Sequence, residues 1–142
     1  VVRGDDVSVW PFTVIRGDVN FVRIGDRTNI QDGTVVHVSH DGPHAKLGSN
    51  SVVNQDIPPY MLVDGNPGKP RSFNIEGLRR RGFSADRIAA IKAMHKYLYR
   101  DGMALEQART AMVELLKVHP EADADIHTML DFLAHSKRGI VR

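Results

Sequence analysis

The sequence predicts a left-handed parallel β-helix of about two to three coils, followed by a C-terminal α-helical bundle. Three observations predict this fold. Aliphatic residues recur every six positions in the first half, glycine and proline concentrate before residue 70, and apolar residues after Ser84 follow the period of α-helices. We therefore expect a β-helix over residues 1–70 and a helical domain over residues 71–142.

The six-residue repeat is the strongest signal. In a hexapeptide β-helix the repeated aliphatic residue points into the core, and glycine or asparagine tolerates the tight corners. Two breaks in phase, near residues 19–22 and 39–45, are expected to be loops that leave the coil. An ordinary β-sandwich is the alternative, although five in-phase repeats are hard to obtain in one. The repeated aliphatic residues are Val9, Ile15, Ile24, Ile30, Val36, Leu47 and Val53.

So few coils make a short solenoid, because each coil buries its inner face only against its neighbours. The missing stability has two available sources, trimerisation and the C-terminal helices, and both would cover exposed strand edges. We therefore expect a homotrimer.

Three helices are expected in the second half. Ser84 is a suitable N-cap for the first, with Asp86 in its first turn and Gly102 as its C-cap. The second runs over about residues 105–119 and the third over about residues 122–135. Their expected inward residues are Ile88, Ile91, Tyr97 or Leu98, then Ala108, Met112, Leu115 and Leu116, then Ile126, Met129, Leu130 and Leu133.

Charge and composition exclude several classes of protein. The net charge of +2 is too small to indicate binding to nucleic acid or to a membrane surface, and no apolar run is long enough to span a membrane. The chain has no cysteine, which excludes disulfides and thiolate metal sites, and we expect a cytoplasmic protein. Residues 66–142 carry 14 basic and 9 acidic side chains, which suits an anionic ligand there.

Two stretches of the first half resemble a known family. Val14-Ile15-Arg16-Gly17-Asp18, with Asn29-Ile30-Gln31-Asp32-Gly33 and Val36-His37-Val38 after it, is similar to the γ-class carbonic anhydrases, which are trimeric left-handed β-helices. The resemblance covers about residues 1–48. It implies that Arg16 and Asp18 lie at the subunit interface of a trimer.

The same resemblance implies an incomplete metal site. Gln31 and Asp32 match residues beside the active centre, and His37 matches one zinc ligand. The two further histidines of the family lie on a coil that this sequence lacks, and His40 and His44 fall in the inserted loop instead. Catalytic zinc uses three protein ligands and an open position. We therefore expect no cofactor, with zinc as the alternative if His40 or His44 joins His37.

The rest of the chain, about residues 54–142, resembles a second family. Gln55-Asp56-Ile57-Pro58-Pro59-Tyr60 with Gly65-Asn66-Pro67 is the usual end of a hexapeptide acyltransferase β-helix. Asn74-Ile75-Glu76-Gly77-Leu78-Arg79-Arg80-Arg81-Gly82-Phe83 is more specific. It is similar to the acyl carrier protein-dependent UDP-N-acetylglucosamine O-acyltransferases of lipid A synthesis. An acyltransferase-like terminal rung would then follow the coils that end near residue 48.

In that family the residues matched by Asn74, Glu76 and Arg80 contact the UDP-sugar. An amide and a carboxylate can hydrogen-bond uracil and ribose, and a guanidinium can bind a phosphate through two parallel bonds. The structural alternative is that Glu76 and the arginines only form a charged helical turn. No residue here matches the family's catalytic histidine, so the catalytic residues are unassigned.

Two resemblances joined end to end indicate a chimera or a shortened chain. The first functional hypothesis is a trimeric scaffold without catalysis, derived mainly from the acyltransferase and keeping weak UDP-sugar contacts. The alternatives are an active acyltransferase, with acyl carrier protein as a partner, and a zinc protein like carbonic anhydrase.

Overall fold

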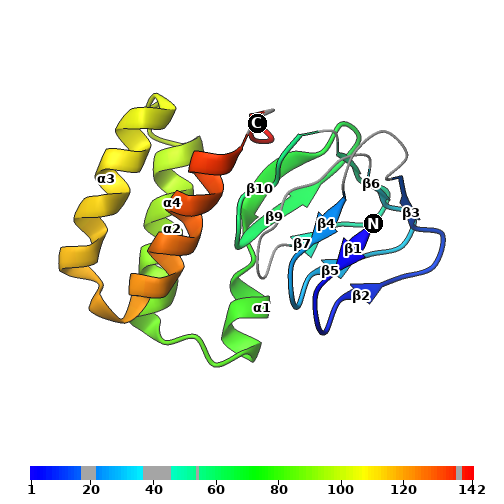
Figure 1. Cartoon of the computed structure of the whole chain (residues 1–142), viewed down its shortest axis with the longest axis horizontal. Coiled ribbons are helices and arrows are strands. Elements are labelled where there is room, and N and C mark those ends of the chain that lie inside the picture. The colour runs from blue at the N-terminus through cyan, green and yellow to red at the C-terminus, as the bar shows by residue number, and fades with distance from the viewer. Residues whose placement is uncertain (17–21, 37–45, 54, 137–138) are drawn as a thin grey trace. The chain divides into compact units, whose positions relative to one another are not determined.

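The structure, a computed structural model, describes residues 1–16, 22–36, 46–53, 55–136 and 139–142. It divides into two compact units (Figure 1). The first comprises Val1–Asn74 together with Ser136–Arg142, and the second comprises Ile75–His135. The last residues of the chain therefore belong to the first unit, although the sequence assigned them to the helical domain.

Short parallel strands build the first unit. Their bounds are β1 Val2–Arg3, β2 Ser8–Val9, β3 Val14–Ile15, β4 Arg23–Ile24, β5 Asn29–Ile30, β6 Val35–Val36, β7 Lys46–Leu47, β8 Val52–Val53 and β9 Met61–Asp64. They form three parallel stacks, β1-β4, β2-β5-β7-β9 and β3-β6-β8. Strands that recur in the same stacks from one coil to the next give the topology of a parallel β-helix. Its left-handedness stays a prediction.

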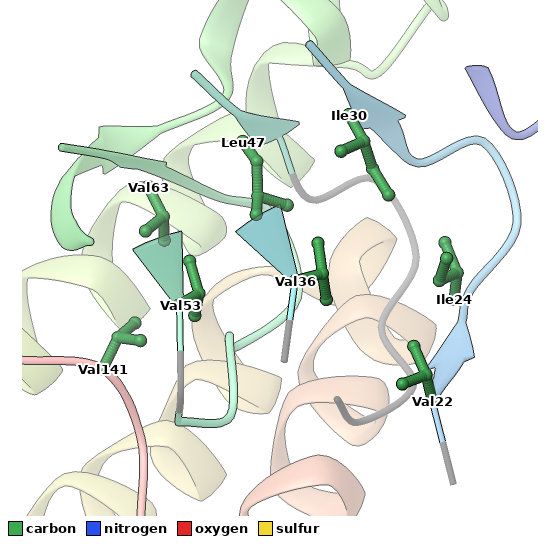
Figure 2. Close-up of a cluster of buried hydrophobic side chains, with 8 residues drawn as sticks. All are labelled: Val22, Ile24, Ile30, Val36, Leu47, Val53, Val63 and Val141. Atoms are coloured by element: carbon green, nitrogen blue, oxygen red, sulfur yellow. The ribbon is translucent and has the colours of Figure 1, made fainter. Parts of the chain in front are cut away.

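The expected aliphatic repeat forms the core of these coils (Figure 2). Ile24, Ile30, Val36, Leu47 and Val53 are all buried in one cluster, and Ile15 packs against it. The parallel register explains this, because Ile30 lies between its neighbours Val9 and Leu47 in one stack. Val9 is 45% exposed because β2 is the edge strand of its stack.

Three further core residues were not expected. Val22 is 1% exposed, so the prediction that residues 19–22 leave the coil was wrong at that position. The expected loops otherwise lie outside the described residues. Val63, on β9, and Val141, near the C-terminus, complete the cluster. The core of the first unit therefore contains residues from both sides of the helical segment.

The corners of the coils use left-handed backbone. Gly33 and Asn50 have φ angles of 65° and 57°, as the sequence predicted for glycine and asparagine at corners. Asp6, Phe12 and Arg27 adopt the same conformation, which the sequence did not indicate. Hydroxyl groups next to these residues satisfy nearby carbonyl groups: Thr28, Thr34 and Ser51 donate to Gly25, Gly48 and Gly48.

The strand β10, Lys69–Phe73, pairs antiparallel with β9 and ends the coils. The second unit follows, with α1 Ile75–Arg80, α2 Ala85–Tyr99, α3 Leu105–Val118, the 3-10 turn η1 Pro120–Ala122 and α4 Asp123–His135. The three long helices were predicted to within a few residues, whereas α1 was considered only as a charged turn. In the described ranges, no helix is both long and apolar enough to cross a membrane.

Most of the expected inward residues of these helices are buried. Ser84 caps α2 as predicted, since its hydroxyl accepts from the Arg87 amide at 3.3 Å. The C-cap is Arg100, not Gly102, although Gly102 has a φ of 66° two residues later. The buried expected residues are Ile91, Leu98, Ala108, Met112, Leu115, Ile126, Met129 and Leu133, whereas Ile88, Tyr97, Leu116 and Leu130 are half-buried.

Candidate functional site

Asn74 is the last residue of the first unit and is held by the β9–β10 hairpin. Asn74 is only 8% exposed, and its backbone N–H donates to the Tyr60 carbonyl at 2.7 Å. Tyr60 is itself 2% exposed and has a φ of 68°. The backbone of Asn74 is therefore held by a buried residue at the end of the coils.

Glu76 and Arg80 lie on α1 in the second unit. Leu78 anchors this short helix, because it is fully buried. Glu76 is in the first turn and Arg80 in the last, where their charges complement the helix dipole. Both residues are exposed. The described geometry therefore leaves a carboxylate and a guanidinium on the surface of α1.

Gly82 ends the arginine run. Its amide donates to Arg79 at 3.0 Å, the Phe83 amide donates to Leu78 at 3.2 Å, and Gly82 has a φ of 74°. This pair of bonds is the Schellman motif, which favours glycine at this position. The glycine after the arginines is thus explained by the end of the helix. Any binding of a ligand by this segment would depend on the arginine guanidinium groups.

Arg79 and Arg80 differ in their surroundings. The Arg79 guanidinium contacts the Glu76 carboxylate at 3.2 Å, one turn away on the same helix, and both side chains are more than half exposed. Such an exposed pair contributes about 0–1 kcal/mol. For Arg80, no carboxylate lies in ion-pair range within the described part of the chain. Arg80 is therefore the better placed of the two to receive an anion.

The residues expected around a carbonic anhydrase-like site are only partly described. Gln31 and Asp32 lie at a corner of the coil, where their carbonyl groups accept from the Thr13 hydroxyl at 3.0 Å and the Asn50 amide at 2.9 Å. The Arg16 amide donates to Val36 at 2.9 Å. Asp18, His37, His40 and His44 lie outside the described residues. Among the described residues, no three histidines or carboxylates cluster in a way that could hold a metal ion.

The most concentrated polar contacts of the second unit were missed by the sequence reasoning. Asp86 accepts from the Glu121 amide at 3.2 Å and lies 2.7 Å from Nδ1 of His119. Ser84 donates to the Glu121 carboxylate. These groups join the start of α2 to the segment before α4. Contacts of this kind hold the helices together.

His95 lies in an environment that lowers its pKa. It is 7% exposed on α2, with the Tyr99 ring centroid 5.4 Å away. Burial lowers the pKa of His95 below 6.5, and the positive charge of Arg100 lowers it further. His95 is therefore a neutral packing residue at pH 7.

Residues 56–141 match the protein family described as UDP N-acetylglucosamine O-acyltransferase, domain 2. The matched segment includes Asn74, Glu76 and Arg80. It also extends from Asp56, at the end of the coils, to Val141 in their core.

Named relatives of the chain are acyl-(acyl-carrier-protein)–UDP-N-acetylglucosamine O-acyltransferases. The protein from Paracidovorax citrulli is 58% identical over 71% of this chain and 38% of its own length. The one from Verminephrobacter eiseniae is 51% identical over 85% of this chain and 47% of its own length. The one from Burkholderia mallei is 39% identical over 98% of this chain and 55% of its own length. The chain thus spans about half the length of these relatives.

The chain also superposes on solved structures of UDP-N-acetylglucosamine acyltransferases. A UDP-N-acetylglucosamine acyltransferase from Campylobacter jejuni superposes with a TM-score of 0.84 at 26% identity, over 99% of this chain and 53% of the other. The enzyme from Francisella novicida superposes with a TM-score of 0.82 at 27% identity, over 96% of this chain and 48% of the other.

Both halves of the chain match the same family, and the interpretation of the chain as two joined families is not supported. A match that covers 98% of the chain includes its first coils, so the N-terminal part aligns with the same relatives as the helical part. No comparison supports a carbonic anhydrase-like segment over residues 1–48 or a chimera. The short sequence stretches behind that resemblance were too brief to separate two kinds of hexapeptide β-helix.

Proposed function

The chain belongs to the UDP-N-acetylglucosamine O-acyltransferase family, and we propose that it acts in acyl transfer from acyl carrier protein to UDP-N-acetylglucosamine by binding the nucleotide sugar. The observation that carries this proposal is the family match, which runs from residue 56 to residue 141 through Asn74, Glu76 and Arg80. The segment with these residues also matches relatives named for this reaction.

The chemistry of the three residues supports binding of a UDP-sugar. The Asn74 amide and the Glu76 carboxylate can hydrogen-bond uracil and ribose, and the Arg80 guanidinium can bind a phosphate with two parallel bonds. Arg79 already contacts Glu76 on the same helix. We therefore assign phosphate binding to Arg80 and a helper role, orienting the Glu76 carboxylate, to Arg79.

Catalytic activity is proposed here, whereas the sequence alone favoured a protein without it. The sequence favoured an inactive scaffold, with an active acyltransferase as the alternative. The relatives named here are acyltransferases, so they favour the alternative. Because the chain spans about half of their length, acyl transfer by this chain is a proposal, and the general base stays unassigned.

A homotrimer of left-handed β-helices belongs to the same proposal. Association of coils from three copies would cover strand edges and bury apolar surface. Arg16 and Asp18 are the residues we expect at the interface between copies.

Calorimetry with UDP-N-acetylglucosamine tests the binding proposal. Arg80→Ala should weaken binding by about 10- to 100-fold, because a hydrogen bond to a charged group contributes about 1.5–3 kcal/mol. Lys117→Ala is the matched control, since Lys117 lies on α3 in an exposed pair with Glu114. If the Arg80 and Lys117 variants bind UDP-N-acetylglucosamine with equal affinity, Arg80 has no role in binding and α1 is only a structural element.

A radiolabelled acyl-transfer assay with acyl carrier protein as donor tests catalysis separately. We expect product above the level without enzyme. Binding without any product would return the chain to the scaffold interpretation. Absence of both would remove the whole proposal.

A further inference from the structure

The C-terminal segment of the first unit is tied to Asp56 through both its backbone and its side chain. The Asp56 amide donates to the Gly139 carbonyl at 3.1 Å, and the Val141 amide donates to the Asp56 carbonyl at 2.9 Å. These bonds form a parallel bridge between Asp56 and Ile140. The Ser136 hydroxyl donates to Oδ2 of Asp56 at 2.8 Å. One residue at the end of the coils thus binds both parts of the segment that the structure describes.

The same segment is anchored in the core by apolar side chains. Val141 is 2% exposed and lies in the cluster with Val53 and Val63 (Figure 2). Ile140 is 4% exposed, and Asp56 is fully buried. Burial of this degree fixes the segment on the coils.

The position of the segment in the chain gives these contacts a mechanical consequence. The second unit, Ile75–His135, follows directly after Asn74, and Ser136 returns to the first unit directly after its last helix. The helical unit is therefore joined to the coils by covalent links at both of its ends. The first link continues from the β9–β10 hairpin. The second depends on the contacts of Ser136, Ile140 and Val141 with the coils.

We propose that Ser136 and residues 139–141 form a strap that latches onto Asp56, and that this latch restricts the movement of the helical unit relative to the coils. A unit held at one end can reorient about a single linker, whereas a second attachment limits the accessible orientations. The strap is held by one buried carboxylate, one bridge and two apolar side chains. It can open locally without unfolding the helices, because regions with few contacts open at lower free energy than the core.

Hydrogen exchange tests the latch. Val141→Asp places a charge in the apolar cluster and should speed exchange of the Asp56 and Val141-position amides at least tenfold. The amides of α2, α3 and α4 should keep their protection. Val118→Asp is the matched control, because Val118 is 66% exposed and the chemical change is the same. If the Asp variant does not fold, Ser136→Ala removes the hydroxyl donor and is followed at the same amides.

Two outcomes would overturn the latch. Unchanged exchange at Asp56 in both variants would show that the strap does not hold this position. Equal loss of protection in the strap and in the three helices would show that the whole chain opens as one unit. In neither case does the result depend on a ligand, so it is independent of the proposed function.

A distance measurement tests the restriction of movement. The chain has no cysteine, so Lys69→Cys and Lys92→Cys provide two unique sites for spin labels, one in each unit, both on exposed residues. We expect Val141→Asp to widen the distribution of distances between the labels, and Val118→Asp to leave it unchanged. An unchanged width in a variant whose strap exchanges rapidly would refute the mechanical role.

Discussion

Arg87 and Asp125 form a two-pronged ion pair between α2 and α4. Nε of Arg87 lies 2.7 Å from Oδ2 of Asp125, and Nη2 lies 2.8 Å from Oδ1. The Asp125 side chain is 4% exposed. The Arg87 guanidinium also lies over the Phe83 ring, 3.7 Å from its centroid. The two parallel bonds fix how these helices meet within the bundle.

Removal of one partner of this pair should destabilise the bundle strongly. Arg87→Met leaves the Asp125 carboxylate buried without its guanidinium, and breaking a buried pair from one side costs about 3–5 kcal/mol. Urea unfolding followed by circular dichroism measures the loss. Lys117→Ala, in an exposed pair, should cost less than about 1 kcal/mol. Similar losses in the two variants would contradict the structural role given to Asp125.

Acid should weaken the fold through His95. Burial and Arg100 lower the pKa of His95 in the folded state, whereas the unfolded chain keeps a value near 6.5. As the pH falls below 6.5, the unfolded chain binds the proton first, so the free energy of unfolding decreases until the lower folded pKa is passed. At higher pH the group is neutral in both states and has no effect.

Urea unfolding of the wild type and His95→Gln, at about pH 7.5 and about pH 5.5, measures this contribution. The variant should lose less stability on acidification than the wild type. His127→Gln is the control, because His127 is an exposed histidine on α4. A pH dependence that persists unchanged in the His95 variant would assign the effect to another group.

Core and outer positions of the coils should differ in their tolerance of alanine. Leu47 on β7 is 4% exposed between β5 and β9, so Leu47→Ala should cost about 2–5 kcal/mol. Val14 on β3 is 47% exposed, and Val14→Ala should change stability by about 0.5 kcal/mol or less in the isolated chain. Urea unfolding curves of the wild type and the two variants give both changes in unfolding free energy, provided that the slopes of the curves are equal. A large effect at Val14 alone would place its side chain in an interface between copies.

Phe12 offers a stabilising substitution. Its φ is 60° and its side chain is 90% exposed, so the residue has left-handed backbone and few contacts to compensate. The left-handed region costs about 1–2 kcal/mol for most residues, and asparagine adopts it more readily. Phe12→Asn should raise the unfolding free energy by about 1 kcal/mol. Phe12→Ala removes the same ring without this preference and should change little, whereas destabilisation by both substitutions would show that the ring is buried in the assembled protein.

The homotrimer predicts a mass three times the 15.8 kDa of the chain in light scattering at micromolar concentration. We expect Arg16 to pair with Asp18 of a neighbouring copy, and Arg16→Ala should shift the distribution toward monomer, because a partly buried ion pair is costly to break from one side. Lys92→Ala, at an exposed position on α2, should leave the mass unchanged. A monomer mass for the unaltered chain would remove the interface assigned to Arg16 and Asp18.

The sequence predicted those parts of the fold whose signal is periodic. Ile30 and Leu47 were found because each lies in a six-residue repeat, and Met112 and Met129 because they lie on helical stripes. Val63 escaped because only Ile57 precedes it at the six-residue spacing, and Val141 escaped because no repeat leads to it. They reach the core through β9 and through the return of the chain after the helices. A spacing rule along the sequence carries no information about such returns.

The site was predicted less completely than the fold. The family resemblance identified Asn74, Glu76 and Arg80 as a group, and the structure describes each of them. The sequence could not reveal the pair of Arg87 with Asp125 or the contact of Ser136 with Asp56, because these partners are far apart in the chain and of ordinary residue types. Contacts of this kind depend on how helices and coils meet.

Val141 has a consequence for the order of events during synthesis. The apolar cluster of the coils is complete only when Val141 joins Val53 and Val63, yet the ribosome makes the whole helical segment between Val63 and Val141. At about 5–20 residues per second this interval lasts roughly 4–15 s. Until then the nascent coils lack the contacts of Val141, so the helical segment is synthesised before the apolar cluster of the coils is complete.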